Sequence, residues 1–373
     1  VMALLRQLKL SAGWHLAALA FFGLTPIFAS YAQAVYSDTL YTAVILLFCV
    51  QTCEMLLVGV RGFRQSTAMA MTALLCSMVR GIGLYVVLLC AAGLVVFGLR
   101  GKARLQVGAV LAVPLALFMV FQLAVLPALG IQDRTASAMY SLPFQQSARV
   151  LRDHADTVTE AEYVEIDRVL DAETLPALYQ TVISDPVKFT FRQYGADAQT
   201  EQEALRRYRK TWLAMMRIYP LTYLETFVAG STGYYAFTPK IDAARTFNNQ
   251  GGVRFYFESF NVREDERYLH TAQIPAFQKA RELLAMAARG WRRVPVLELF
   301  LFCGTYTWLL VIAALSLLRQ KRSRDLIAFL PALLSLIVCV FSPVNDYFRY
   351  FLPIVAVTVP LLALAKKPTE ENV

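Results

Sequence analysis

Eight apolar stretches constrain this chain more than any other feature of its sequence. Crossing about 30 Å of hydrocarbon takes about 20 helical residues, and most of the stretches approach or exceed that length. Mean hydropathy is +0.48, and only 17% of the 373 residues are charged. The sequence therefore predicts an all-α polytopic membrane protein. The stretches are Leu10–Ala32, Leu40–Val60, Gln65–Val79, Ile82–Leu99, Leu105–Leu129, Val294–Leu318, Leu326–Phe341 and Phe351–Ala365.

Residues 65–79 and 326–341 form stretches that are shorter than a full membrane span. The stretch at 65–79 would form a short hairpin with residues 82–99, either spanning or re-entrant, with Arg80 at its tip. About eight membrane helices are expected, some of them short or re-entrant.

The net charge of +9 is distributed in a way that indicates orientation in a bilayer. Basic residues gather in short loops between apolar stretches, as at 100–104 and 319–324, and such loops stay in the cytoplasm. This pattern argues against nucleic acid as a partner. Eight crossings place both termini in the cytoplasm and three polar stretches on the outer face, residues 36–39, 130–293 and 342–350.

The same division predicts three segments. Residues 1–129 hold the N-terminal membrane helices, residues 130–293 form an α-rich extracytoplasmic segment with interfacial helices between membrane helices five and six, and residues 294–373 hold the C-terminal membrane helices. No internal repeat is apparent.

Two helices stand out inside the extracytoplasmic segment. Thr159, followed by Glu160 and Glu162, gives an acidic first turn and predicts a helix start. Residues 201–218 carry apolar side chains on one helical stripe and basic side chains on the other. That amphipathic helix could lie on anionic lipid or pack against the rim of the membrane bundle.

Metal and cofactor chemistry has little support in the sequence. All six cysteines lie inside apolar stretches, and three histidines are too scattered to suggest a metal site. Gly-rich phosphate loops and the Gly-x-Ser-x-Gly motif are absent. No cofactor is firmly implied, and a divalent metal ion, although conceivable, is unsupported.

A polar turn near the C-terminus, Ser342–Tyr350, suggests a site. It places Asp346 and Arg349 in a loop too short to leave the membrane surface, and charged residues there mark functional sites or interfacial anchors. Arg349 could bind a phosphate bidentately. Both interpretations, a site and a plain interfacial turn, remain open.

Asp38 and Arg80 are the other charged residues of interest on the predicted outer face. Asp38 opens an apolar helix, where an aspartate also serves as an N-cap. Arg80 could join a phosphate-binding group.

Several motifs together resemble the DUF6020 family of bacterial multi-pass membrane proteins, which is similar to GT-C glycosyltransferases. They are Tyr36-Ser-Asp38-Thr-Leu40, Arg80-Gly-Ile-Gly-Leu-Tyr85, Leu142-Pro-Phe-Gln-Gln146-Ser-Ala-Arg149, Ser184-Asp-Pro-Val-Lys188, Tyr219-Pro220 and the turn at 342–350.

The resemblance implies transfer of a sugar from a polyprenyl-phosphate carrier to a cell-envelope acceptor on the outer face of a bacterial plasma membrane. Its expected partners are that lipid-linked donor, the acceptor and membrane lipids. Asp38 or Asp346 would be the catalytic base that takes the proton from the acceptor hydroxyl. The expected substrate-binding residues are Arg349, Tyr350, Asn345 and Arg80 near the donor, and Gln145, Gln146, Asp167 and Lys188 on the acceptor side.

One departure from the GT-C pattern matters. GT-C proteins carry their principal acid in a first outer loop that follows an earlier membrane helix, and this chain begins beyond that point. Either the N-terminal part is lacking, or Asp38 does the work of two acids, or the chain is not a transferase. A transporter or flippase of lipid-linked or anionic solutes and a non-catalytic envelope assembly partner remain alternatives.

Overall fold

The structure is a computed structural model that describes residues 1–32, 36–60, 62–130, 139–192, 198–237, 275–291 and 293–366. Within these ranges the chain is helical, with two isolated β-bridges and no strand. It divides into two compact units. Unit 1 comprises Val1–Ala128, Gly252–Leu336 and Phe348–Val373, and unit 2 comprises Leu129–Gly251 and Ile337–Tyr347. The expected all-α class is confirmed. Residues 131–138, 193–197, 238–274 and 292 of the predicted extracytoplasmic segment lie outside the described ranges.

All eight apolar stretches form helices, and among the described residues five helices are long and apolar enough to cross a membrane. Two bent pairs raise that number to seven if each pair is one span. The multi-pass class is therefore confirmed, whereas the expected number of eight stays a prediction. The five are Ser37–Val58 (α4), Gly81–Gly98 (α6, Gly81–Gly93, with η1, Leu94–Gly98), Gly101–Ala128 (α7, Gly101–Val120, with η2, Phe121–Val125, and α8, Leu126–Ala128), Ser323–Phe341 (η6, Ser323–Phe329, with α19, Leu330–Phe341) and Phe348–Lys366 (α20).

The bent pairs break next to a proline or at an extended residue. Ala12–Leu24 (α2) and Pro26–Ala32 (α3) meet at 44°, and Thr25 between them has an extended ψ of 131°, as sterics require of a residue before proline. Pro295–Leu301 (α17, Pro295–Glu298, with η5, Leu299–Leu301) and Cys303–Arg319 (α18) meet at 82°. The other unit 1 helices are Met2–Gln7 (α1), Phe63–Val79 (α5), Pro275–Phe277 (η4) and Gln278–Trp291 (α16).

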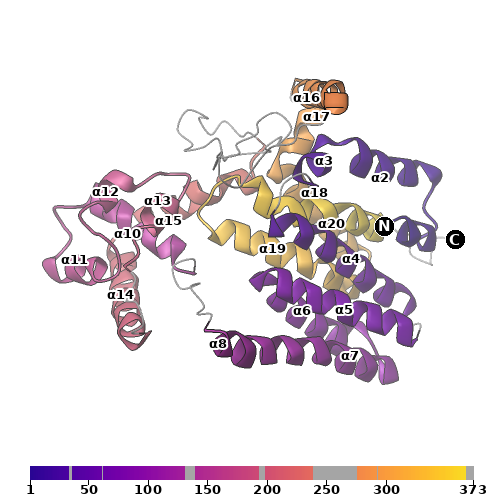
Figure 1. Ribbon diagram of the computed structural model, residues 1–373, viewed down its shortest axis with the longest axis horizontal. Coiled ribbons are helices and arrows are strands. Elements are labelled where there is room, and N and C mark those ends of the chain that lie inside the picture. The colour runs from indigo at the N-terminus through magenta and orange to yellow at the C-terminus, as the bar shows by residue number, and fades with distance from the viewer. Residues whose placement is uncertain are drawn as a thin grey trace. The chain divides into compact units, whose positions relative to one another are not determined.

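Helix α20 lies at the centre of unit 1, packed against α4 and α18 (Figure 1). Of the 18-residue apolar stretch of α20, 83% is buried, whereas the corresponding stretch of the span Gly101–Ala128 is only 17% buried. Lipid chains are as apolar as leucine, so an exposed apolar helix at the edge of a membrane bundle costs little.

Small and hydroxyl residues allow these helices to pack closely. A Cβ on Gly83 would lie 1.8 Å from the carbonyl oxygen of Cys76, so α5 and α6 touch through backbone at this position. The hydroxyls of Thr42, Thr52 and Thr358 donate to the carbonyls four residues earlier at 2.7 to 2.9 Å. Each helix therefore satisfies these polar groups internally, as a membrane environment demands.

Unit 2 is a small helical domain with its own core. Phe144, Ile166, Tyr208 and Met215 are fully buried at its centre. Its elements are Ser141–Asp153 (α10), Glu160–Asp167 (α11), Leu175–Leu178 (α12), Asp185–Lys188 (α13), Ala198–Ile218 (α14), Pro220–Ser231 (α15) and Thr232–Tyr234 (η3), together with the turn at 342–347.

Both helices predicted in this segment are present. Thr159 is the N-cap of α11 and forms a full capping box with Glu162. Helix α14 includes the predicted 201–218 helix, and its stripe faces inward, with Leu205, Tyr208 and Met215 buried in the core of unit 2. The stripe is therefore covered by protein within unit 2, which is neither of the two partners expected from the sequence.

Candidate functional site

Three helix N-termini in unit 1 bring charged residues together. Asp38 lies in the first turn of α4, Arg80 is the N-cap of α6, and Arg349 lies in the first turn of α20. The Oδ1 atom of Asp38 is 2.7 Å from Nη1 of Arg80, and its Oδ2 atom is 3.1 Å from Nε of Arg349. Asp38 is only 5% exposed. Residues that are distant in the sequence thus form one ion-paired group.

Tyrosine rings hold both guanidinium groups. The Cζ atom of Arg349 is 4.5 Å from the ring centroid of Tyr36 and 5.1 Å from that of Tyr350. The Cζ atom of Arg80 is 4.8 Å from the Tyr350 ring and 5.9 Å from the Tyr41 ring. Tyr350 therefore contacts both arginines, and cation–π attraction restrains their planes. We call Asp38, Arg80 and Arg349 with these three tyrosines the arginine cluster.

The arginine cluster has an excess of positive charge. Among its six residues, two guanidinium groups face one carboxylate, a formal charge of +1, and the three helix N-termini add their positive dipole ends. A guanidinium carries five N–H donors, so two of them offer more donors than one carboxylate can accept. The arrangement is suited to binding an anion, and phosphate matches the planar fork of arginine.

Capping does not account for Asp38. The N-cap of α4 is Tyr36, no side-chain cap hydrogen bond is made there, and Asp38 lies two residues further along. Its carboxylate favours the positive end of the helix, but both oxygens are in contact with arginines.

Asn345 and Asp346 belong to unit 2, where they fix the turn at 342–347. The side-chain amide of Asn345 donates to the carbonyl of Ala229 at 2.9 Å and accepts from the backbone N–H of Gly233 at 2.6 Å. Asp346 is 2% exposed and has a positive φ of 54°. A Cβ on Gly233 would lie 2.4 Å from the Cβ of Asp346, so only glycine permits this approach. Their expected roles in catalysis and substrate binding stay predictions.

The two glutamines expected on the acceptor side are buried in unit 2. Gln145 donates through Nε2 to the carbonyl of Gln180. Gln146 donates to the carbonyl of Tyr223 at 3.1 Å and accepts from the indole N–H of Trp212 at 3.0 Å. These amides therefore support the interior of unit 2.

The other two acceptor-side candidates lie near the surface of unit 2. Asp167 pairs with Arg192 at 2.8 Å and lines a pocket. Lys188 pairs with Asp185 at 2.6 Å, one helical turn away. Contact of either residue with a substrate stays a prediction.

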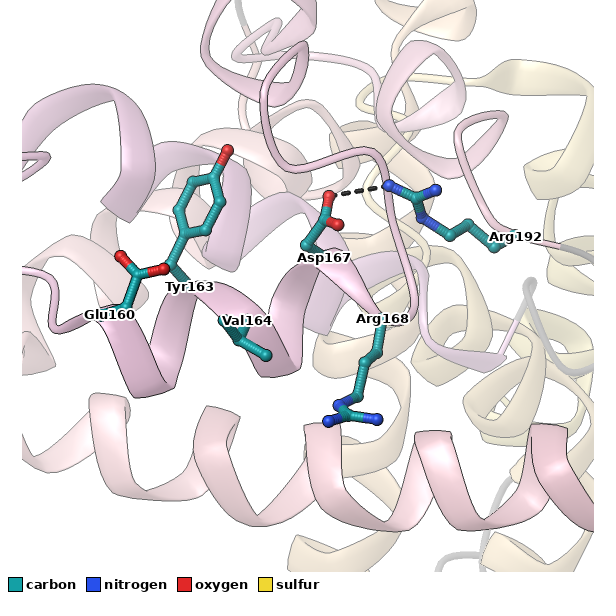
Figure 2. A pocket seen from close by; sticks show the side chains of 6 residues that line it. All are labelled: Glu160, Tyr163, Val164, Asp167, Arg168 and Arg192. Atoms are coloured by element: carbon teal, nitrogen blue, oxygen red, sulfur yellow. Dashed lines mark hydrogen bonds and ion pairs between the residues drawn. The ribbon is translucent and has the colours of Figure 1, made fainter.

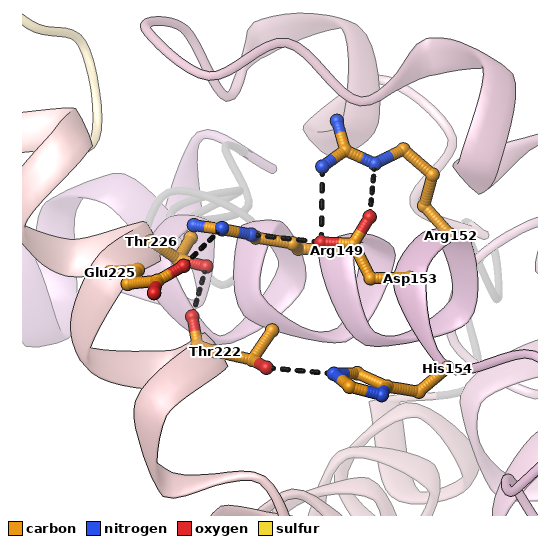
Figure 3. Close-up of polar contacts among 7 residues, drawn as sticks. All are labelled: Arg149, Arg152, Asp153, His154, Thr222, Glu225 and Thr226. Carbon is orange, nitrogen blue, oxygen red and sulfur yellow. Dashed lines mark hydrogen bonds and ion pairs between the residues drawn. The ribbon is translucent and has the colours of Figure 1, made fainter.

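A second polar cluster in unit 2 was not anticipated from the sequence (Figure 3). Nε of Arg149 is 3.2 Å from Oδ2 of Asp153, and its Nη2 atom pairs with Glu225. Arg152 pairs with Asp153 at 2.6 Å and stacks on Tyr179 at 4.4 Å. The hydrogen bond from Arg152 lowers the pKa of Asp153. The i,i+4 spacing of Arg149 and Asp153 was the available signal.

The tyrosines of the arginine cluster were only partly anticipated. Tyr350 was expected beside the phosphate, whereas stacking by Tyr36 and Tyr41 was not. In the part of the chain that the structure describes, no group of three or more histidine, cysteine, aspartate or glutamate side chains could hold a metal ion.

The apolar spans and the cluster at their N-termini define an all-α, multi-pass membrane protein with a second helical unit. Residues 1–372 match the model of a family described as "Family of unknown function (DUF6020)". The chain belongs to the DUF6020 family, as its motifs indicated. Neither the curated proteins nor the solved structures contain a significant match to it.

Proposed function

We propose that this chain is a membrane-embedded glycosyltransferase of the GT-C type, or the C-terminal part of one. It moves a sugar from a polyprenyl-phosphate carrier to a cell-envelope acceptor on the outer face of the bacterial plasma membrane. The observation that supports the proposal most is the contact of Asp38 with Arg80 and Arg349 at the ends of three membrane helices.

The two arginines bind the carrier phosphate. The N–H donors of each planar guanidinium group match two phosphate oxygens. The Tyr350 ring contacts both guanidinium groups and restrains their orientation. When the bond between the sugar's anomeric carbon and the phosphate oxygen breaks, its electron pair stays on that oxygen. Negative charge therefore grows where the arginines and the helix dipoles are already oriented, which lowers the barrier.

Asp38 is the base in this proposal. Carrier phosphate competes for the guanidinium groups that pair with Asp38, which leaves the carboxylate able to accept a proton. The acceptor hydroxyl gives that proton to Asp38 as its oxygen forms the new bond to the anomeric carbon. Asp38 is preferred to Asp346 as the base because its carboxylate contacts both arginines that would bind the carrier phosphate.

The test uses full-length protein in lipid bilayers with a radiolabelled sugar on polyprenyl phosphate. We expect Asp38→Asn to lower transfer by about 10²- to 10⁴-fold, the usual contribution of a general base. Arg349→Lys keeps the positive charge but loses the bidentate N–H donors of the guanidinium group, and we expect the rate of sugar transfer to fall by about 10²-fold. Arg152→Lys is the matched control, since Arg152 also stacks on a tyrosine and pairs with an aspartate, but in unit 2. Unchanged turnover in both Asp38→Asn and Arg349→Lys would remove this mechanism.

A further inference from the structure

Unit 2 carries a surface pocket of about 360 Å³ beside α11 (Figure 2). That volume lies at the lower end of the range for small-molecule sites, about 300 to 1,000 Å³. Tyr163 and Asp167, four residues apart, project from the same side of α11, and Arg192 reaches Asp167 from a later segment. The lining residues are Glu160, Tyr163, Val164, Asp167, Arg168 and Arg192.

The formal charges of the four ionised lining residues cancel, and Arg168 also pairs at 3.3 Å with Glu165, which lies outside the lining. Glu160 and Asp167 supply two carboxylates, and Arg168 and Arg192 supply two guanidinium groups. A charged ligand would gain attraction from one pair of these groups and repulsion from the other. A neutral ligand with several hydroxyls can instead donate to the carboxylates and accept from the guanidinium groups.

The central side chains are fixed without any ligand. Asp167 accepts from the backbone N–H of Ala172 at 3.1 Å and from Nη2 of Arg192 at 2.8 Å. Nε of Arg192 donates to the carbonyl of Leu170 at 3.1 Å. Tyr163 packs partly against the core of unit 2, so its ring is restrained. Groups that are already ordered lose little conformational entropy when a ligand binds.

We infer that this pocket binds a neutral saccharide. The apolar face of a sugar ring packs on Tyr163, as apolar groups do on aromatic rings, and its hydroxyls bond to Asp167 and Arg192. The ion pair between these two residues is about half exposed, 42% and 47%, so both side chains can hydrogen-bond to a ligand while they stay paired with each other. If the chain is a glycosyltransferase, a glycan acceptor is the natural occupant. Binding itself does not depend on transfer.

The experiment measures binding to full-length protein in nanodiscs by saturation-transfer difference NMR, without any donor lipid. The probes are the methyl glycosides of glucose, galactose and mannose, with glucosamine and glucuronate as charged comparisons. We expect at least one neutral glycoside to bind in the millimolar range and more tightly than either charged sugar.

Variants locate that binding. Tyr163→Leu should weaken it about three- to tenfold, in line with the energy of aromatic contacts, and Asp167→Asn by about tenfold. Tyr163→Phe keeps the ring and should stay within about threefold. Glu203→Gln is the matched control, because it opens exposed ion pairs on α14 and Glu203 is not among the lining residues of the pocket.

Three results would overturn the inference: no binding of any methyl glycoside, tighter binding of a charged sugar, or equal binding by Tyr163→Leu and Glu203→Gln. Because no donor is present, failure here leaves the transfer assay on Asp38 and Arg349 unaffected, and the reverse also holds.

Discussion

The change Asp38→Asn should have opposite effects on stability and on phosphate binding. Unit charges 4 Å apart interact by about 4 kcal/mol at an effective dielectric constant of about 20, and Asp38 contacts two guanidinium groups. The gross attraction is therefore about 8 kcal/mol, against several kcal/mol for dehydrating a carboxylate that is 5% exposed. Breaking such buried pairs costs about 3 to 5 kcal/mol. The arginine side chains are 22% and 20% exposed, so we expect about 3 kcal/mol.

Binding of inorganic phosphate should become tighter in the same variant. The formal charge of the arginine cluster rises from one to two. An added unit charge about 8 Å from the anion is worth about 0.5 kcal/mol at the dielectric constant of water and about 2 kcal/mol at a value of about 20. The dissociation constant should therefore fall by about two- to thirtyfold.

Thermal unfolding in detergent and phosphate titration, both on full-length protein, measure the two effects. Asp325→Asn is the matched control, because Asp325 pairs with a single arginine, Arg322, at 2.6 Å. It should cost less stability and leave phosphate binding unchanged. If Asp38 were only a helix cap, asparagine would replace it at little cost. Unchanged stability, or weaker phosphate binding, would therefore refute the reasoning.

Three further outcomes are expected. Gly233→Ala should lower the free energy of unfolding by about 1 to 3 kcal/mol, since its Cβ would lie 2.4 Å from that of Asp346; the same change at Gly290, with no atom within 4 Å, is the thermal-unfolding control. The pKa of Asp153 is lowered from an ordinary 3.8. The contribution of its carboxylate to the free energy of unfolding is therefore complete above about pH 4 and is lost as pH falls through the lowered pKa. Acid unfolding of Asp153→Asn should lack this loss. On amphipathic α16, Leu283 is 65% exposed, and a label on Leu283→Cys in nanodiscs should be quenched from the lipid phase, whereas quenching only from water would contradict this.

The helices could be predicted because their causes are local. Apolar length specifies a span, and proline at positions such as Pro26 sets where it bends. The capping box at Thr159 is likewise contained in four residues. The contact between Asp38 and Arg349 could also be anticipated, because the loop charges predict that both residues lie on one face of the bilayer.

Other features depend on contacts between distant residues and leave no local pattern. The turn at 342–347 joins unit 2 because Asn345 bonds to Gly233 and the hydroxyl of Tyr234 donates to the carbonyl of Val344 at 2.6 Å. The apolar stripe on α14 was visible in the sequence, but the residues that pack against it were not. An apolar helix face predicts burial without indicating which element buries it. The pocket at Asp167 likewise requires Arg192, 25 positions later, to be brought alongside.

The order in which the arginine cluster is synthesised has a consequence for biogenesis. Arg349 follows Asp38 by 311 positions (349 minus 38), so a growing chain first exposes Asp38 and Arg80 to the bilayer as an electrically balanced couple. The surplus charge arises only when α20 inserts. A nascent or prematurely terminated polypeptide without Arg349 therefore lacks the surplus charge that the arginine cluster would offer to an anion.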